Sequence, residues 1–371
     1  MSLERAHQLV QRFRQGVGAG ERPTHPPWTL DFAMGRELME SMLLARHLDV
    51  AAHELRAEGL GHYTICSSGH EANVVFGRLT RLSDPTLVHY RSAALQIERA
   101  RQAPEVDLAR DIALSLVASS EEPLCSGRHK AFGSHRLGII PQTSTIASHL
   151  PRAVGLAFAL ERRERLSLPR VAPSDAIAFA SFGDATVNHS TALGAFNAIS
   201  WTLHQHLKLP LLLVCEDNGL GLSVRTPPGW VETRLRGLPH LEYFFADGTD
   251  LEATYRAAAA AVDHCRRSRL SAVLHLRCVR LLGHAGSDVD TVYRSASEIE
   301  EALEKDPVLL AATSLIAGGA LDARAMLELD RAAEQRVRAA AEYAGTRPKL
   351  KSRSQVMEAI ARPIPRQDTD A

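Results

Sequence analysis

The sequence contains little cysteine, and its cysteines form no recognisable framework. There are five, an odd number, and they lie far apart without a Cys-x-x-Cys pair: Cys66, Cys125, Cys215, Cys265 and Cys278. This arrangement argues against a disulfide scaffold and against a structural zinc site of the common kinds. It favours a protein of a reducing compartment.

An excess of charge of one sign is also missing. The 43 lysines and arginines cancel the 43 aspartates and glutamates. Because no net field surrounds the chain, neither nucleic acid nor an anionic membrane surface is an expected partner. Any anionic ligand must therefore be held by a local group of side chains.

Long hydrophobic runs are absent as well. The longest, from Ala153 to Leu160, is far shorter than the roughly 20 residues that cross a bilayer as a helix. The N-terminal residues MSLERAHQLVQRFRQ contain no apolar signal core, so we expect a cytoplasmic protein without a membrane span. With 371 residues, of which 45% are hydrophobic and 23% charged, the chain has the composition of a soluble enzyme with a large core.

What the sequence does contain is an alternation of strand-like and helix-like segments. Three short apolar runs have the length of buried strands: 177–182, 209–215 and 272–281. Helical patterns lie between and before them: 150–162, 190–204, and a third that begins at a capping box formed by Thr249 and Glu252. This order predicts an α/β fold with a mostly parallel central sheet and helices on both faces.

The chain divides into three expected parts. Residues 1–35 are rich in glycine, proline and polar residues, and we expect an N-terminal arm that lies on this subunit or on a partner. Residues 36–321 hold the α/β pattern of the ligand-binding domain. Residues 322–371 contain a helix rich in Ala, Arg and Glu, followed by a polar tail.

Polar residues follow two of the apolar runs. Asp184 comes after the run 177–182, and Asn218 comes after the run 209–215. If the helix between them joins neighbouring parallel strands, both side chains point into one crevice at the carboxyl edge of the sheet. A carboxylate, an amide oxygen and a backbone carbonyl of the loop 219–221 form a hard oxygen set suited to Mg²⁺, which a diphosphate would complete.

Cationic and hydrogen-bonding groups follow two further runs. Tyr90 and Arg91 follow a short run that ends near residue 88, and His284 follows the run 272–281. Arginine binds phosphate well through its planar guanidinium. Each residue taken alone is more commonly a cap, a turn or a surface ion pair, but together with Asp184 and Asn218 they predict a crevice for a metal and a diphosphate.

Several segments resemble the alpha subunits of thiamine-diphosphate-dependent 2-oxo acid dehydrogenases. They occur in the order those subunits show and cover about residues 40–310: SSGHEA, VHYRSAA, TIASHLPRAVGLAFA, GDATVNHSTALGAFNAIS with LPLLLVCEDNGLGLS, DGTDLEATYRAAAAA and RLLGHAGSDVDTVYRS. The fourth segment and its continuation match the family's Gly-Asp-Gly and Asn-Asn cofactor motif. The resemblance therefore implies the thiamine-diphosphate-binding fold.

The resemblance also implies a cofactor site for thiamine diphosphate and Mg²⁺. It makes Asp184, Asn218 and the backbone oxygen of Leu220 the magnesium ligands. It gives the other cofactor contacts to Tyr90, Arg91 and Arg280 at the diphosphate, Ile146 at the aminopyrimidine, and Ala185 and Asn188 in the lining. His284 corresponds to the catalytic loop histidine near the reacting intermediate.

The chain departs from the family pattern at several positions. Ala185 replaces the second glycine of the motif, which requires a backbone outside the left-handed region. Asp217 replaces the first asparagine. Ser148 with His149 replaces the pair that holds potassium in branched-chain subunits, so the resemblance does not carry that ion over to this chain. Ala285 stands where regulated relatives have a phosphorylatable serine. His135 is a candidate for the substrate pocket.

The resulting hypothesis is an alpha subunit that decarboxylates a 2-oxo acid, most closely of the branched-chain type, and passes the acyl group to a lipoyl domain. The implied partners are a beta subunit, in a tetramer of two alpha and two beta chains, and a lipoyl-bearing acyltransferase. Pyruvate or acetoin dehydrogenase remains the alternative within this class.

Three readings from other classes compete with this hypothesis. A dinucleotide-binding domain needs a glycine-rich turn directly after the first strand, and neither GVGAG nor GLGL lies in that context. A metal cluster of His129, His135 and His149 matches no common zinc spacing. A non-catalytic homologue could use the same fold as a scaffold, although the joint presence of Arg91 and the other site residues argues against it.

Overall fold

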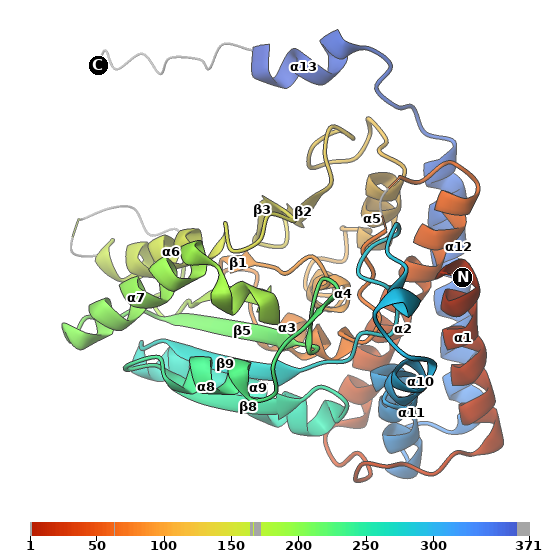
Figure 1. The fold of residues 1–371 in the computed structure, drawn as a ribbon, viewed down its shortest axis with the longest axis horizontal. Helices are drawn as coiled ribbons and strands as arrows, with labels where there is room; N and C mark the ends of the chain where they lie inside the picture. Colours follow the sequence, from red (N-terminus) through yellow and green to blue (C-terminus); the bar gives the residue numbers. More distant parts are fainter. Residues whose placement is uncertain (1, 63, 164–165, 167–171, 362–371) are drawn as a thin grey trace.

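The computed structural model describes residues 2–62, 64–163, 166 and 172–361, and a seven-stranded sheet flanked by helices forms its centre (Figure 1). The strands, in spatial order, are β2 (Ala131–Ser134), β3 (Ile139–Thr143), β1 (Thr86–Leu87), β4 (Ala178–Gly183), β5 (Leu211–Asp217), β9 (Ala272–Arg277) and β8 (Glu242–Asp247). Only β2 runs antiparallel to its neighbour. The predicted α/β class with a mostly parallel sheet is confirmed.

Helices cover both faces of the sheet at β4 and β5. Successive side chains of a strand point to opposite faces, and on these strands both sets are mainly apolar, so both faces are packed against helices. Ala178, Ala180 and Phe182 pack on one face beneath α6 (Leu150–Arg162) and α7 (Ser190–His204). Phe179, with Leu212 and Val214, packs on the other face against α9 (Leu251–Ser268) and α3 (Val74–Leu79). The central strands are therefore buried between two helical layers.

The predicted elements agree with the observed ones except at one helix start. The observed α6 and α7 have the predicted bounds, and β4, β5 and β9 overlap the three apolar runs. The predicted capping box at Thr249 is wrong, because Asp250 is the N-cap and accepts a hydrogen bond from Ala253 N. Glu252 instead accepts from the backbone N–H and hydroxyl of Thr29.

A second group of helices stands beside one end of the sheet, where α1 (Ser2–Ala19), α2 (Phe32–Ala57) and α12 (Ala323–Gly345) lie side by side (Figure 1). Leu9, Phe13 and Val17 of α1 are buried against this group. The segment expected to form an arm thus contains a helix packed on this chain. The proposed boundaries at residues 35 and 321 stay predictions.

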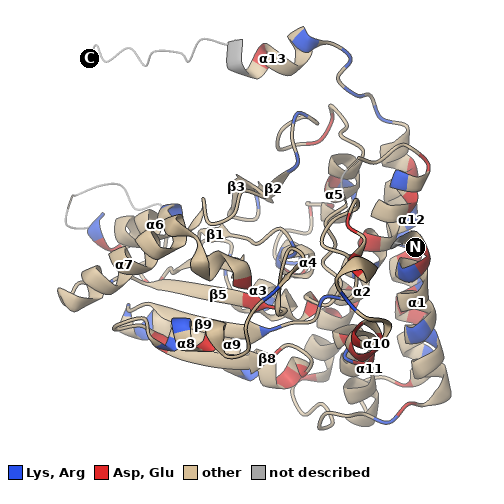
Figure 2. Cartoon of the chain, viewed as in Figure 1, with Lys and Arg blue, Asp and Glu red and all other residues tan. Residues whose placement is uncertain are grey.

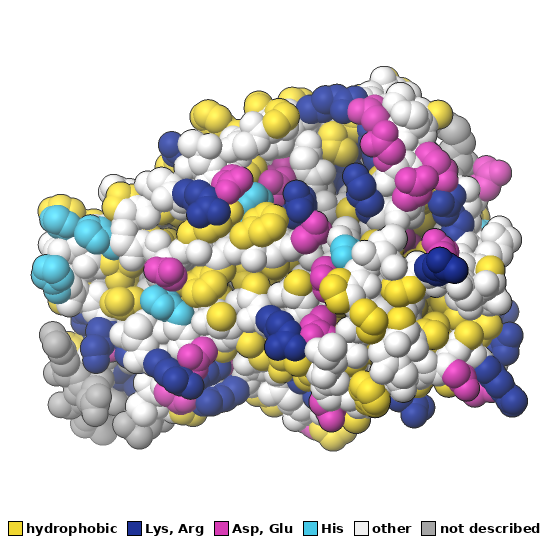
Figure 3. Space-filling model, turned by 90° about the horizontal axis from the view of Figure 1, so that it is seen from below, with side chains coloured by type: hydrophobic (Ala, Val, Ile, Leu, Met, Phe, Trp, Pro, Cys, Tyr) yellow, Lys and Arg dark blue, Asp and Glu magenta, His cyan; other side chains and the backbone are white. Residues whose placement is uncertain are grey.

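Shorter elements complete the fold: η1 (Glu71–Asn73), α4 (Ala93–Ala100), α5 (Leu108–Leu116), η2 (Asp184–Asn188), α8 (Trp230–Arg236), η3 (Asp290–Val292), α10 (Ala296–Glu304), α11 (Pro307–Ala317) and α13 (Arg353–Ala361), with a small hairpin of β6 (Leu220–Gly221) and β7 (Val224–Arg225). Charged residues of both signs are scattered over the helices (Figure 2) and mixed on the face seen in Figure 3. Among the described residues, no helix is long and apolar enough to cross a membrane.

Candidate functional site

The candidate site lies where four neighbouring strands end. Strands β1, β4, β5 and β9 are adjacent and parallel, so their carboxyl ends meet at one edge of the sheet. The segments that leave these ends carry Tyr90 with Arg91, Asp184, Asn218 and His284, and all five line one pocket. Residues that are up to about 200 positions apart in the chain are thereby collected in one place.

Asp184 begins η2 directly after β4 and is almost fully buried. Burial raises the pKa of its carboxyl group, and the hydroxyl of Thr226 donates a hydrogen bond to its Oδ2. Ala185 has no positive φ, so its methyl group is compatible with the local backbone. A methyl group on Gly221 would lie 3.0 Å from the Cβ of Ala185, which shows how closely the two loops approach.

Asn218 is held by the loop that follows β5. Gly219 has φ +74, which glycine adopts without strain, and it turns the chain into the β6–β7 hairpin. The Oδ1 atom of Asn218 accepts a hydrogen bond from Leu220 N at 3.1 Å. Asp184, Asn218 and Leu220 all line the pocket, so a carboxylate, an amide and a backbone carbonyl are available as hard oxygen donors for a divalent ion.

Arg91 joins the loop after β1 to the loop after β9. One of its terminal nitrogens donates to the backbone oxygen of His284 at 2.9 Å and lies 3.1 Å from His284 Nδ1, and the other donates to Cys66 O. Burial and the charge of Arg91 lower the pKa of His284 to about 4, so the imidazole is neutral at pH 7. A phosphate group that binds Arg91 would compete with these contacts to the His284 loop.

The pocket is small in this form of the chain. It encloses about 20 Å³, which is space for an ion or a water molecule and not for a complete coenzyme. A larger ligand would need to lie partly outside it or to displace the loop that carries His284. Asp288 fixes this loop through a hydrogen bond from His284 N and another from the Tyr293 hydroxyl.

Two of the predicted site residues lie outside the pocket lining. The guanidinium of Arg280 donates to Leu222 O and to the Tyr293 hydroxyl, while its buried Nε has no partner. Asn188 accepts a hydrogen bond from the indole N–H of Trp230. Ile146 and Ala185, by contrast, do line the pocket with the five strand-end residues.

A larger cavity lies next to the pocket and encloses about 520 Å³. Tyr90 lines both spaces, so the two adjoin. The predicted candidate His135 lines the larger cavity together with Phe132 and Lys130. Burial lowers the pKa of Lys130 to about 8.

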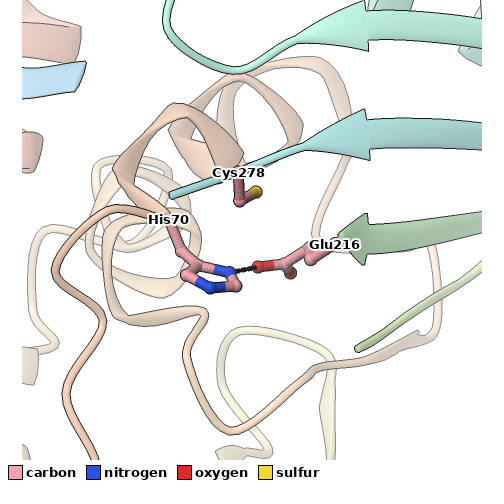
Figure 4. A group of neighbouring side chains, drawn as sticks. All are labelled: His70, Glu216 and Cys278. Atoms are coloured by element: carbon pink, nitrogen blue, oxygen red, sulfur yellow. Dashed lines mark hydrogen bonds and ion pairs between the residues drawn. The ribbon is translucent and has the colours of Figure 1, made fainter. Parts of the chain in front are cut away.

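Sequence reasoning missed a buried group behind the strand ends, formed by His70, Glu216 and Cys278. Figure 4 shows the His70 ring directed at Glu216, the penultimate residue of β5, with Cys278 beside them directly after β9. In the described part of the chain this is the one set of three or more such side chains whose ligand atoms lie close enough for a metal ion. Burial raises the pKa of the Cys278 thiol well above its ordinary value, which disfavours the thiolate that a metal requires.

Comparison with known proteins adds a family to this geometry. The model of the dehydrogenase E1 component family matches residues 39–353. The chain is 27% identical over 283 residues to the 2-oxoisovalerate dehydrogenase subunit alpha of Bacillus subtilis, covering 74% of this chain and 79% of that protein. It is 22% identical over 316 residues to the testis-specific mitochondrial pyruvate dehydrogenase E1 component subunit alpha of Rattus norvegicus, covering 83% and 74%. The family match includes every strand of the sheet.

Proposed function

Since the chain belongs to the dehydrogenase E1 component family, as an alpha subunit of the 2-oxo acid dehydrogenase type, we propose that it decarboxylates a branched-chain 2-oxo acid oxidatively and passes the acyl group to a lipoyl domain. The observation that carries this proposal is the convergence of Arg91, Asp184, Asn218 and His284 on one pocket at the carboxyl edge of the sheet. A cofactor that carries a diphosphate and a metal ion needs cationic, carboxylate and hydrogen-bonding groups of this kind at its diphosphate end.

The family implies thiamine diphosphate, and we propose that Mg²⁺ accompanies it. When bound, the coenzyme supplies a carbanion that adds to the 2-oxo carbon and accepts the electrons released with carbon dioxide. The residues present fit this pair, because Asp184, Asn218 and the carbonyl of Leu220 offer three hard oxygens on adjoining loops. Asp184 would contribute the negative charge, and the other two would contribute neutral dipoles.

Arginine and tyrosine side chains would hold the diphosphate. Arg91 is buried at the pocket and carries a fixed positive charge, so it would bind the phosphate oxygens with the help of Tyr90. Arg280, which has an unpaired buried Nε, would approach the diphosphate from the segment after β9. Ala185, Asn188 and Ile146 would contact the rest of the cofactor. His284 is neutral at pH 7, so it would either donate a hydrogen bond to the reacting group or accept one from it.

A partner subunit would complete the site. Apolar side chains are exposed on the segments that follow β5 and β9: Leu222, which lines the pocket, Val224 and Val292 are 51%, 69% and 82% exposed. Exposed apolar groups next to a site are typical of an interface. They support a beta subunit in a tetramer of two alpha and two beta chains, with a lipoyl-bearing acyltransferase as the acceptor of the acyl group.

The larger cavity supports the proposed choice of substrate. Its lining includes apolar residues such as Leu48 and Phe132 and charged residues such as Asp111, and its volume of about 520 Å³ leaves room for a branched side chain beside Tyr90. This supports a branched-chain 2-oxo acid over pyruvate or acetoin. Localisation in the cytoplasm stays a prediction.

A substrate panel on the reconstituted complex tests the proposal. We expect cofactor-dependent turnover of branched-chain 2-oxo acids at a higher kcat/KM than of pyruvate or acetoin, and loss of turnover in Asp184→Asn. A preference for pyruvate or acetoin would move the chain to the alternative substrate class. No turnover of any 2-oxo acid, together with a stable complex, would favour a non-catalytic scaffold.

A further inference from the structure

The buried pair of His70 and Glu216 lies directly behind the proposed metal ligand Asn218. His70 Nδ1 is 2.7 Å from Glu216 Oε2, and His70 Nε2 is 3.0 Å from Asn218 Nδ2. His70 and Glu216 are fully buried, and Ser92 and Asn73 donate further hydrogen bonds to the same carboxylate. The three side chains thus form one continuous chain of hydrogen bonds that ends at the pocket.

The direction of each hydrogen bond follows from the chemistry of its ends. The amide oxygen of Asn218 accepts from Leu220 N–H, so the group of Asn218 that faces His70 Nε2 is its NH₂, which can only donate. His70 Nε2 is therefore the acceptor and carries a lone pair. The ring proton then lies on Nδ1, which donates to Glu216 Oε2.

A lone pair on Nε2 can be satisfied only by the NH₂ group of Asn218. The amide oxygen of Asn218 must then point the other way, towards Leu220, whose N–H it accepts. That is the side on which Asp184 and the Leu220 loop line the pocket. If the amide were reversed, its NH₂ group would face the pocket and could not bind a cation.

From this geometry we propose that Glu216 and His70 are positioning residues that fix the amide of Asn218 with its oxygen towards the metal. This inference rests on the proposed function, because it needs Asn218 to be a ligand. The inference also explains the group of His70, Glu216 and Cys278 without a metal ion bound to it. Nδ1 of His70 is hydrogen-bonded to Glu216, and Cys278 takes no part in the chain of hydrogen bonds.

Two substitutions of His70 separate positioning from simple space filling. Glutamine can donate to Glu216 and accept from Asn218, whereas leucine fills similar space and does neither. We expect His70→Leu to weaken Mg²⁺-dependent binding of thiamine diphosphate to the reconstituted complex by about 10- to 100-fold, as is usual for groups that orient a metal ligand. We expect His70→Gln to restore most of that loss, and Cys278→Ala to bind like the wild type.

Calorimetry and nitrogen NMR supply the readouts. In ¹⁵N-histidine-labelled protein without cofactor, His70 should show a protonated Nδ1 and a bare Nε2. The inference is overturned if His70 carries its proton on Nε2, or if His70→Leu binds as tightly as the wild type. It is also overturned if Cys278→Ala releases a bound metal ion. Failure of the wild type itself to bind thiamine diphosphate would instead refute the proposed function.

Discussion

At the scale of single residues, the carboxylate of Asp184 supplies the negative charge of the proposed metal site, since Asn218 and Leu220 contribute only neutral oxygens. We expect Asp184→Ala to abolish binding of thiamine diphosphate with Mg²⁺ while the chain stays folded, because the cation that screens the diphosphate is lost. Calorimetric titration measures the binding and circular dichroism the fold. Asp263→Ala, at an exposed ion pair on α9, is the matched control. Affinity like that of the wild type in Asp184→Ala would contradict the site.

The contact between Ala185 and Gly221 gives a second test at this scale. A Cβ on Gly221 would lie 3.0 Å from the Cβ of Ala185, so we expect Gly221→Ala to lower the unfolding free energy by about 1 to 3 kcal/mol through overpacking. In the background of Ala185→Gly, the same change should cost clearly less, because the clashing methyl group is gone. Chemical denaturation of the four proteins measures this coupling. Additive effects would show that the two loops do not meet.

At the scale of elements, a buried arginine ties three helices together. Arg46 of α2 donates to Glu71 in η1 at 2.8 Å and to both oxygens of Asp306, the N-cap of α11, at 2.8 Å. We expect Arg46→Met to cost about 3 to 5 kcal/mol of unfolding free energy, since two buried carboxylates lose their counter-charge. Arg324→Met, at an exposed pair on α12, should cost less than about 0.5 kcal/mol. Equal losses in thermal unfolding would contradict this assignment.

The loop that carries His284 is the element expected to move. Because Arg91 now binds this loop, a diphosphate at Arg91 would rearrange it, and we expect slower amide hydrogen exchange over residues 283–293 once thiamine diphosphate binds. His284→Ala should reduce acyl transfer to a lipoyl acceptor by roughly a hundredfold and leave the dissociation constant of the cofactor nearly unchanged. An unaltered transfer rate would exclude the proposed role of His284.

Some elements were predictable because local physics determines them. Strands β4 and β5 are buried on both faces, so each is found as a mainly apolar run, and the polar residues Asp184 and Asn218 that follow them mark the carboxyl edge. The start of α9 was not predictable, because Glu252 is engaged by Thr29, which is distant in sequence. The pair of His70 and Glu216 was missed for the same reason, since its members are 146 residues apart.

At the scale of the whole molecule, the residues proposed to hold the cofactor would contact its diphosphate end, and apolar side chains are exposed on neighbouring segments. Leu222, Val224 and Val292 are exposed on the segments that follow β5 and β9. An added beta subunit should cover these side chains. We therefore expect beta-subunit binding to raise the melting temperature of this chain in a concentration-dependent manner.

Turnover by the isolated chain is the measurement that tests the central claim most directly. The chain is purified with and without a beta subunit, and decarboxylation of a branched-chain 2-oxo acid is followed with thiamine diphosphate, Mg²⁺ and an artificial electron acceptor. The proposal predicts no turnover by the chain alone and robust turnover by the pair. Comparable turnover by the chain alone would show that its site is complete without a partner, and would contradict the assignment as an alpha subunit of a two-chain active site.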